Sequence, residues 1–205
     1  MAAPILLVSG FGPFGGEGIN PSWEVARRLH SKTFGGLRIE AIRLPVDCGR
    51  AARRMTSAIE SLSPRAVLGL GQAGGRPALS IERVAINLAA GRAGNEAGSA
   101  DAAKPVVRGG PDAYFARLPF AAILRALGRH KIPAALSLSA GAYACNAAMY
   151  AALHALRDRS ATRAGFIHLP YDPRQAARHR GAPSMSLDLM EQAVAAALEA
   201  IAKSR

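Results

Sequence analysis

The chain alternates short apolar runs with segments whose apolar residues recur every three or four positions. The short runs are rich in Leu, Ile and Val, which is typical of β-strands, and they occupy residues 5–9, 37–45, 66–71, 79–88, 134–139 and 165–170. Between them, helical spacing is marked by Trp23, Ala26 and Leu29; Met55, Ile59 and Leu62; Ile123, Leu124 and Leu127; Met149, Leu153 and Leu156; and Leu187, Met190, Val194, Leu198 and Ile201. Strands that alternate with helices predict an α/β fold with a mostly parallel central sheet covered on both faces.

Local signals predict some boundaries of these elements. Ser22, after Pro21, is expected to cap the first helix, and "PSMSLD" at 183–188 supplies serine caps and an early Asp to the last one. Residues 79–88 alternate throughout and predict one continuous strand. Residues 90–111 are rich in Gly, Ala and charge, and we expect a loop or hairpin there.

The length of 205 residues predicts a single domain, 1–205, with a substantial core. No apolar run approaches the roughly 20 residues of a membrane-spanning helix. The first apolar stretch lacks a basic region before it, so it is interpreted as a strand and not as a signal peptide. Cys48 and Cys145, the two cysteines, are too few for a disulfide framework. We therefore expect reduced thiols in a cytoplasmic protein.

The formal net charge of +12 raises the hypothesis of nucleic-acid binding. The arginines are spread along the chain, and the densest basic stretch is 174–180. No basic stripe is interleaved with aromatic residues that would stack on bases, so a solvated surface is the favoured interpretation. The five histidines are scattered, and no cysteine or histidine spacing suits a metal, so neither a metal nor a cofactor is expected.

Four of the least generic segments directly follow predicted strands. They are "GFGPFGG" from Gly10, "GQAGGR" from Gly71, "SAGAYACN" from Ser139 and "HLPYDP" from His168. In open α/β sheets, ligands bind outside the carboxyl ends of the strands. We therefore expect these four segments to meet at one functional edge.

Cys145 is the strongest candidate for chemistry because it lies where a Gly-containing turn leads into a helix. The unpaired N–H groups and dipole of a helix N-terminus favour a thiolate. A small core residue is the simpler interpretation of this cysteine taken alone. Cys48 also precedes a helix and is interpreted as structural.

His168 ends a short strand and is a candidate general base, although a buried, hydrogen-bonded histidine is an equal alternative. Glu82 shares its strand face with Val84 and Ile86 and is a candidate for orienting that imidazole. Taken alone, exposure at a sheet edge is the simpler interpretation of Glu82.

The loop after the first strand matches neither dinucleotide-binding nor P-loop spacing. Its Phe11 and Phe14 are expected to form an apolar wall for a flat organic ligand. Arg92 follows the Glu82 strand and is a candidate for oxyanion stabilisation, with a surface charge as the alternative.

The segments "GFGPFGG", "GQAGGR", "ERVAINL", "AGAYACN", "GFIHLPY" and "PSMSLDLM", in this order, closely resemble the pyrrolidone-carboxylate peptidase (pyroglutamyl peptidase I) family. The resemblance runs from about Val8 to the C-terminal helix. It implies an α/β/α sandwich, a homo-oligomer of two or four subunits, and a cytoplasmic cysteine peptidase that removes N-terminal pyroglutamate from peptides.

The resemblance also implies roles for individual residues. Glu82, Cys145 and His168 match the catalytic triad, and Phe11, Phe14, Gln72, Tyr143 and Arg92 match positions that bind the substrate or its oxyanion. The alternative function is a non-catalytic α/β module that binds a small ligand at the same edge. Loss of a triad residue would favour it, and none is lost.

Overall fold

The computed structural model describes residues 3–90 and 103–204. Seven strands form the central sheet in the order β2-β3-β1-β4-β9-β5-β8. Their bounds are β1 Ile5–Phe11, β2 Thr33–Phe34, β3 Leu37–Leu44, β4 Ala66–Gln72, β5 Leu79–Glu82, β8 Ala134–Ser137 and β9 Arg163–Leu169. Strands β6 (Val84–Ile86) and β7 (Ala113–Phe115) pair separately as a two-stranded antiparallel sheet.

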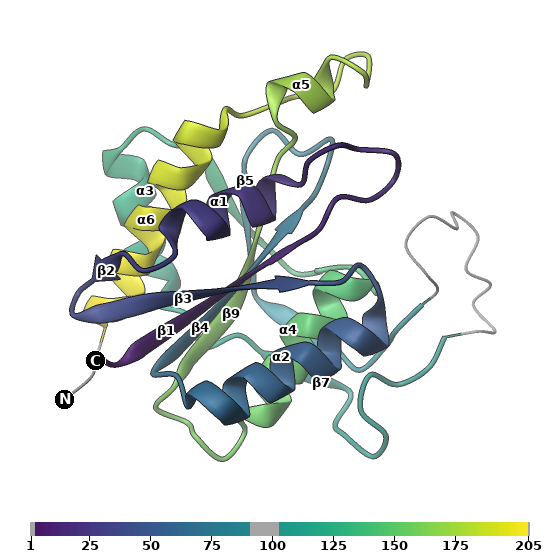
Figure 1. Ribbon diagram of the computed structural model, residues 1–205, viewed down its shortest axis with the longest axis vertical. Coiled ribbons are helices and arrows are strands. Elements are labelled where there is room, and N and C mark those ends of the chain that lie inside the picture. The colour runs from purple at the N-terminus through teal and green to yellow at the C-terminus, as the bar shows by residue number, and fades with distance from the viewer. Residues whose placement is uncertain (1–2, 91–102, 205) are drawn as a thin grey trace.

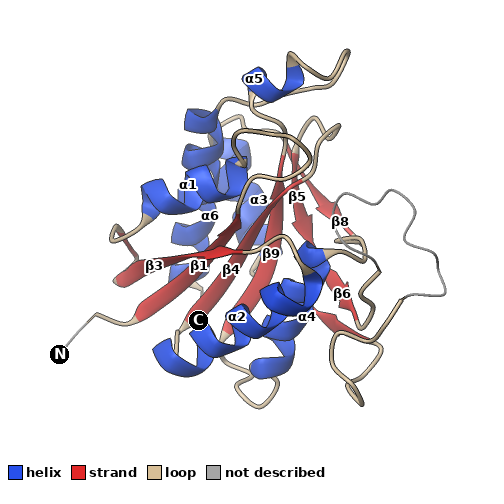
Figure 2. Cartoon of the chain, turned by 45° about the vertical axis from the view of Figure 1, so that its right-hand side comes forward, coloured by secondary structure: helices blue, strands red, loops and turns tan. Residues whose placement is uncertain are grey.

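The helices cover both faces of the sheet, which makes an α/β/α sandwich (Figures 1 and 2). Helices α1 (Pro21–Leu29), α3 (Phe120–Arg129) and α6 (Leu187–Lys203) lie on one face, and α2 (Cys48–Leu62) and α4 (Ala144–Ala155) lie on the other. A short helix, α5 (Pro173–Ala176), follows β9. Each face has its own apolar core, so every strand of the central β1-β4-β9 group is buried from both sides.

The sheet is mostly parallel, but its two halves run in opposite directions. Strands β3, β1, β4 and β9 are parallel to one another, as are β5 and β8, whereas β5 is antiparallel to β9. The prediction of a mostly parallel sheet is confirmed. The expectation that β8 ends at the same edge as β1, β4 and β9 is wrong, because the β4–β5 connection reverses the chain without a crossover helix.

The predicted strand 79–88 is two strands in two sheets. It divides at Arg83, whose backbone N–H still donates to Ser137, while β6 leaves the central sheet to pair with β7. An alternating pattern specifies which side chains share a face, but it does not specify the partner strand.

The first helix is capped by Asn20 and not by Ser22. The Asn20 side chain accepts from the Ser22 N–H, and Pro21 occupies the first helical turn. The Ser22 hydroxyl instead accepts from the Phe11 N–H and donates to Asn20, so it ties the loop to β1. The last helix begins as predicted, since the Ser186 side chain accepts from Leu189 N–H and Asp188 lies in the first turn.

Among the described residues, no helix is both long and apolar enough to cross a membrane.

Candidate active site

Glu82 and His168 meet where strands β5 and β9 pair in the central sheet. Strands β5 and β9 run antiparallel with Ser80 opposite His168, so the Glu82 side chain reaches back to the imidazole. The Nδ1 atom of His168 lies 2.8 Å from Oε1 of Glu82, and both residues are buried. The interpretation of Glu82 as an exposed edge residue is therefore wrong, because β8 covers β5 on its other side.

Arg76 contacts the same carboxylate oxygen, and the sequence analysis did not single it out. Arg76 lies in the loop between β4 and β5, and its Nη1 donates to Glu82 Oε1 at a distance of 2.9 Å. The available signal was an arginine that ends a Gly-rich turn six residues before the candidate carboxylate Glu82. The short separation of Arg76 and Glu82 in sequence predicts a contact only once the direction of the turn between them is known.

The environment of Glu82 favours its ionised form. Burial opposes ionisation, but hydrogen bonds from His168, Ser137 and Arg76 outweigh it, so the pKa of the Glu82 carboxyl lies below its usual range. An ionised Glu82 requires a donor on the facing histidine nitrogen. The Nδ1 of His168 therefore carries the proton, and its Nε2 is left to accept one.

Cys145 is the second residue of α4, as predicted, and its thiol lies over β4. A methyl group placed on Gly71 would lie 2.8 Å from Sγ of Cys145, so only glycine leaves room for the thiol there. Gly71 is the register partner of His168 in the neighbouring strand β9. Because paired residues of neighbouring strands face the same side, the thiol and the imidazole lie over the same face of the sheet.

The thiol of Cys145 is protonated at rest. Burial raises the pKa of the Cys145 thiol to about 12, and the charge of Glu82 acts in the same direction. The Cys145 backbone N–H and the Arg76 charge oppose this rise without cancelling it. The backbone N–H at the helix start acts in the expected direction, toward a thiolate, but lowers the pKa less than burial raises it. A nucleophilic Cys145 needs a neighbouring base.

Asn146, next to the thiol, fixes the start of α4 against β6. Its side chain accepts from Ile86 N–H and donates to the carbonyl oxygens of Ile86 and Leu88, each at 2.9 Å. The residue is buried, so these three bonds satisfy its amide. The cysteine is thereby held in position by a neighbour to which the sequence analysis assigned no role.

The aromatic candidates differ in their exposure. Phe11 is buried and packs on Phe166, which in turn lies 4.9 Å from the His168 ring, measured between centroids. Phe14 and Tyr143 are partly exposed, at 37% and 48%, in the loops after β1 and before α4. Exposed aromatic side chains in these two loops are available to a ligand, whereas Phe11 is part of the core beside Phe166.

Gln72 ends β4 beside the buried Gln175. Its Oε1 accepts from Gln175 Nε2 at 3.0 Å, and Gln175 also donates to the Ile19 carbonyl. The side-chain N–H₂ of Gln72 has no hydrogen-bond partner within residues 3–90 and 103–204 and is available as a donor.

The remaining candidates are placed as follows. Arg92 lies outside the described residues. Cys48 is the first residue of α2, is partly buried, and acts on the pKa of Cys145. Within the described part of the chain, no cluster of three or more His, Cys, Asp or Glu residues is able to hold a metal ion.

Comparisons with known proteins give one consistent result. A family model described as pyroglutamyl peptidase matches residues 5–204. The pyrrolidone-carboxylate peptidase of Escherichia fergusonii is 45% identical over 193 residues, which cover 94% of this chain and 90% of that protein. The crystal structure of pyroglutamyl peptidase I from Bacillus amyloliquefaciens superposes with a TM-score of 0.90 at 35% identity and covers 99% of this chain and 97% of that one.

A variant of the pyrrolidone carboxyl peptidase of Pyrococcus furiosus superposes with a TM-score of 0.87 at 38% identity, covering 96% of this chain and 97% of that one. Sequence and fold therefore agree over nearly the whole length of the chain. The chain belongs to the pyroglutamyl peptidase family.

Proposed function

We propose that Cys145, His168 and Glu82 form the catalytic triad with which this chain removes an N-terminal pyroglutamyl residue from peptides. As a member of the family, the chain is a cysteine peptidase of the pyroglutamyl type. The observation that carries the assignment is the buried 2.8 Å contact between Glu82 and His168 beside the thiol-bearing start of α4.

The first half of the reaction transfers the acyl group to the enzyme. His168 Nε2 accepts the thiol proton as Sγ of Cys145 forms a bond to the pyroglutamyl carbonyl carbon. The electron pair of the carbonyl moves to its oxygen, where backbone N–H groups at the start of α4 stabilise the oxyanion. The C–N bond then breaks, and the imidazolium returns its proton to the leaving amine.

The second half restores the enzyme. His168 Nε2 accepts a proton from water as the water oxygen attacks the thioester. The C–S bond breaks, free pyroglutamate leaves, and the proton returns to Cys145 Sγ. Glu82 holds the Nδ1–H tautomer through both halves and stabilises the imidazolium that forms in each.

Arg92 is proposed, from the family resemblance, to assist at the oxyanion. Its role is separable from that of Arg76, whose guanidinium donates to Glu82. Arg76 therefore acts through the triad as a positioning residue.

The substrate pocket is proposed to pair a neutral lactam. The 5-oxoproline ring is flat and partly apolar, with one N–H donor and one carbonyl acceptor. Phe14 and Tyr143 supply apolar contact, and the N–H₂ of Gln72 suits the lactam carbonyl. A prolyl substrate lacks that carbonyl and carries a charged amine, whose desolvation would oppose binding.

The test compares kcat/KM for pyroglutamyl, prolyl and glutamyl amides of one fluorophore with purified protein. Cleavage of the pyroglutamyl amide and essentially none of the other two is expected. Loss of cleavage after thiol alkylation is expected as well. Comparable rates on the prolyl amide would exclude the lactam pocket.

The non-catalytic alternative is not favoured. Each triad residue is present, Glu82 and His168 are bonded, and the matched relatives are named as peptidases. A small-ligand module does not need a buried, charged carboxylate behind a histidine.

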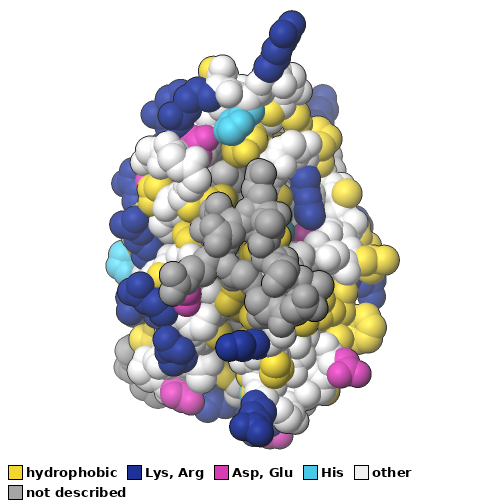
Figure 3. All heavy atoms as spheres, turned by 90° about the vertical axis from the view of Figure 1, so that its right-hand side faces the viewer, with side chains coloured by type: hydrophobic (Ala, Val, Ile, Leu, Met, Phe, Trp, Pro, Cys, Tyr) yellow, Lys and Arg dark blue, Asp and Glu magenta, His cyan; other side chains and the backbone are white. Residues whose placement is uncertain are grey.

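A homo-oligomer is proposed on the strength of exposed apolar side chains near the free edge of the sheet. Strand β8 is an edge strand on which Leu136 is 42% exposed, and Leu138 just beyond it is 74% exposed. Phe115 in β7 is 73% exposed, and hydrophobic side chains are visible on the face shown in Figure 3. A contiguous exposed apolar patch marks an interaction site, and we propose that these side chains form part of one. Sedimentation of the wild type and of Leu138→Asp tests this, with a shift toward monomer expected in the variant.

A cytoplasmic location is also proposed. Neither Cys48 nor Cys145 forms a disulfide bond within the described part of the chain, which suits a reducing compartment.

A further inference from the structure

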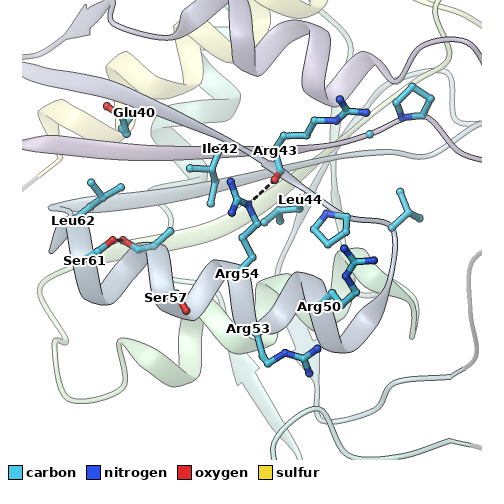
Figure 4. A pocket seen from close by; sticks show the side chains of 15 residues that line it. Glu40, Ile42, Arg43, Leu44, Arg50, Arg53, Arg54, Ser57, Ser61 and Leu62 are labelled. Atoms are coloured by element: carbon cyan, nitrogen blue, oxygen red, sulfur yellow. Dashed lines mark hydrogen bonds between the residues drawn. The ribbon is translucent and has the colours of Figure 1, made fainter.

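A groove of about 1200 Å³ lies between β3 and α2 (Figure 4). One wall is formed by the end of β3 and the loop that follows it, and the other by the outer side of α2. The lining residues are Gly12, Pro13, Glu40, Ile42, Arg43, Leu44, Pro45, Val46, Arg50, Arg53, Arg54, Ser57, Ala58, Ser61 and Leu62.

The groove is strongly basic. Arg43, Arg50, Arg53 and Arg54 line it, and none of them forms an ion pair with a carboxylate elsewhere in residues 3–90 or 103–204. Arg54 donates to the Arg43 carbonyl oxygen at 2.9 Å, as Figure 4 shows. The acidic lining residue, Glu40, accepts from Arg38 at 3.0 Å and does not neutralise the four guanidinium groups. The groove therefore has a surplus of positive charge facing solvent.

One end of the groove lies at the edge that carries the candidate active site. Gly12 and Pro13 directly follow Phe11, and Val46 follows β3 at the same edge. Helix α2 then begins with Cys48, whose thiol is near enough to Cys145 to act on its pKa, while Arg50 lines the groove two residues later. The start of α2 thus lies between the Cys145 thiol and the mouth of the groove.

The dimensions of the groove suit an extended peptide. Helix α2 has 15 residues and is therefore about 22 Å long. An extended chain advances roughly 3.3–3.6 Å per residue, so about six residues would span the helix. A single small anion would contact only one part of such a groove.

We propose that this groove, here named the arginine groove, binds acidic side chains of the peptide that follows the pyroglutamyl residue. Guanidinium groups pair with carboxylates through two parallel hydrogen bonds, which suits Asp, Glu and the terminal carboxylate of a short peptide. The inference rests on the proposed function for the identity of the first residue. It adds a preference for acidic residues downstream of the cleaved bond.

The experiment measures kcat/KM for three pyroglutamyl heptapeptides with Ala at position two and all-Glu, all-Gln or all-Lys at positions three to seven. The wild type is expected to prefer the Glu peptide to the Gln peptide by roughly three- to tenfold, and to cleave the Lys peptide least. The preference should shrink at 1 M salt, where the Debye length falls to about 3 Å.

The test variant is Arg50→Gln/Arg53→Gln, which removes two exposed charges from the groove. The matched control is Arg125→Gln/Arg129→Gln, which removes two exposed charges from α3 on the opposite face of the sheet. The groove variant should cleave the three peptides at similar rates, while the control should keep the wild-type preference. Both should cleave a pyroglutamyl fluorogenic amide, which has no downstream residues, as the wild type does.

Two outcomes would overturn the proposal. One is a wild type that shows no preference for the Glu peptide, or a preference that the groove variant keeps unchanged. The other is loss of oligonucleotide binding in the groove variant with its peptide preference intact, which would assign the groove to nucleic acid.

Binding of a fluorescent pentaglutamate peptide, compared with pentaglutamine, separates the groove from the proposed function. Tighter pentaglutamate binding that is lost in Arg50→Gln/Arg53→Gln would support the groove even if no pyroglutamyl amide were cleaved. Equal binding of the two peptides to the wild type would contradict it even if the amide were cleaved.

Discussion

The Nδ1 atom of His168 lies 2.8 Å from Oε1 of Glu82, and Arg76 donates to that same oxygen at 2.9 Å. One buried carboxylate oxygen therefore accepts from both an imidazole and a guanidinium. The imidazole receives a defined tautomer from this contact, and the carboxylate receives a positively charged partner in Arg76 that keeps it ionised.

Glu82→Gln is expected to lower kcat by about 100-fold or more, with a much smaller change in KM. The glutamine amide can present N–H₂ to Nδ1 and so favours the wrong imidazole tautomer, and it cannot stabilise the imidazolium. Steady-state kinetics on a pyroglutamyl amide measure both constants. Glu191→Gln, which removes an ion-paired carboxylate on α6, is the control. An unchanged kcat in Glu82→Gln would make Glu82 a structural residue.

Arg76→Gln is expected to lower kcat by roughly tenfold and to move the acid limb of the kcat/KM profile to higher pH. Arg76 lowers the pKa values of both Glu82 and Cys145, so its loss raises both. Glu82, faced by His168, Ser137 and Arg76, then protonates at a higher pH as the solution is acidified.

Arg83→Gln provides the matched control for Arg76, because it removes the same charge one residue from Glu82. The Arg83 guanidinium lies over the Phe120 ring, 4.7 Å from its centroid, and not against the carboxylate. Equal shifts of the pH profile in the two variants would mean that general charge, and not the contact with Glu82, sets the profile.

Cys145→Ser is expected to abolish most activity while the protein stays folded, since a hydroxyl is the weaker nucleophile and is nearly the same size. Cys48→Ser should retain most activity, because its side chain lies at the start of α2 and not over Gly71. Circular dichroism and amide cleavage on both variants check this. The assignment is reversed if Cys48→Ser is the inactive protein.

Alkylation of Cys145 in the Cys48→Ser protein should be slow at pH 7 and should accelerate continuously toward pH 12. Burial and the Glu82 charge raise the pKa of this thiol to about 12, so the thiolate fraction is still growing above pH 10. Iodoacetamide labelling followed by mass spectrometry measures the rate. Glu82→Gln in the same background should react faster at pH 9, since the opposing charge is gone. A plateau below pH 8 in the first protein would instead indicate a pre-formed thiolate.

The raised pKa of the Cys145 thiol also makes the free energy of unfolding depend on pH. The unfolded thiol loses its proton near its ordinary value of 9.0, whereas the folded thiol keeps it until about pH 12. The folded state therefore binds more protons across this window, and the free energy of unfolding should fall as the pH rises through it. Chemical denaturation of the wild type and Cys145→Ala at pH 8 and pH 10 compares the slopes, and Cys145→Ala is expected to lose less stability.

Short-range pattern determined which elements form and where the chemistry-bearing residues lie within them. Apolar spacing identified the β1-β4-β9 group and five helices, because burial of one face follows directly from periodicity. The position of Cys145 at a helix start followed from the Gly-containing turn before it. These features depend on neighbours within a few positions, so a single sequence specifies them.

Only the tertiary structure decided the direction of β5 and β8, and with it the environment of Glu82. Alternation at 79–88 is the same whether the strand is exposed or covered, and only pairing with β8 and β9 makes the carboxylate buried and bonded. The Arg76 contact and the raised pKa of Cys145 arise in the same way. The contact depends on the direction of the turn between β4 and β5, and the raised pKa results from burial and from the charge of Glu82, which is distant from Cys145 in sequence.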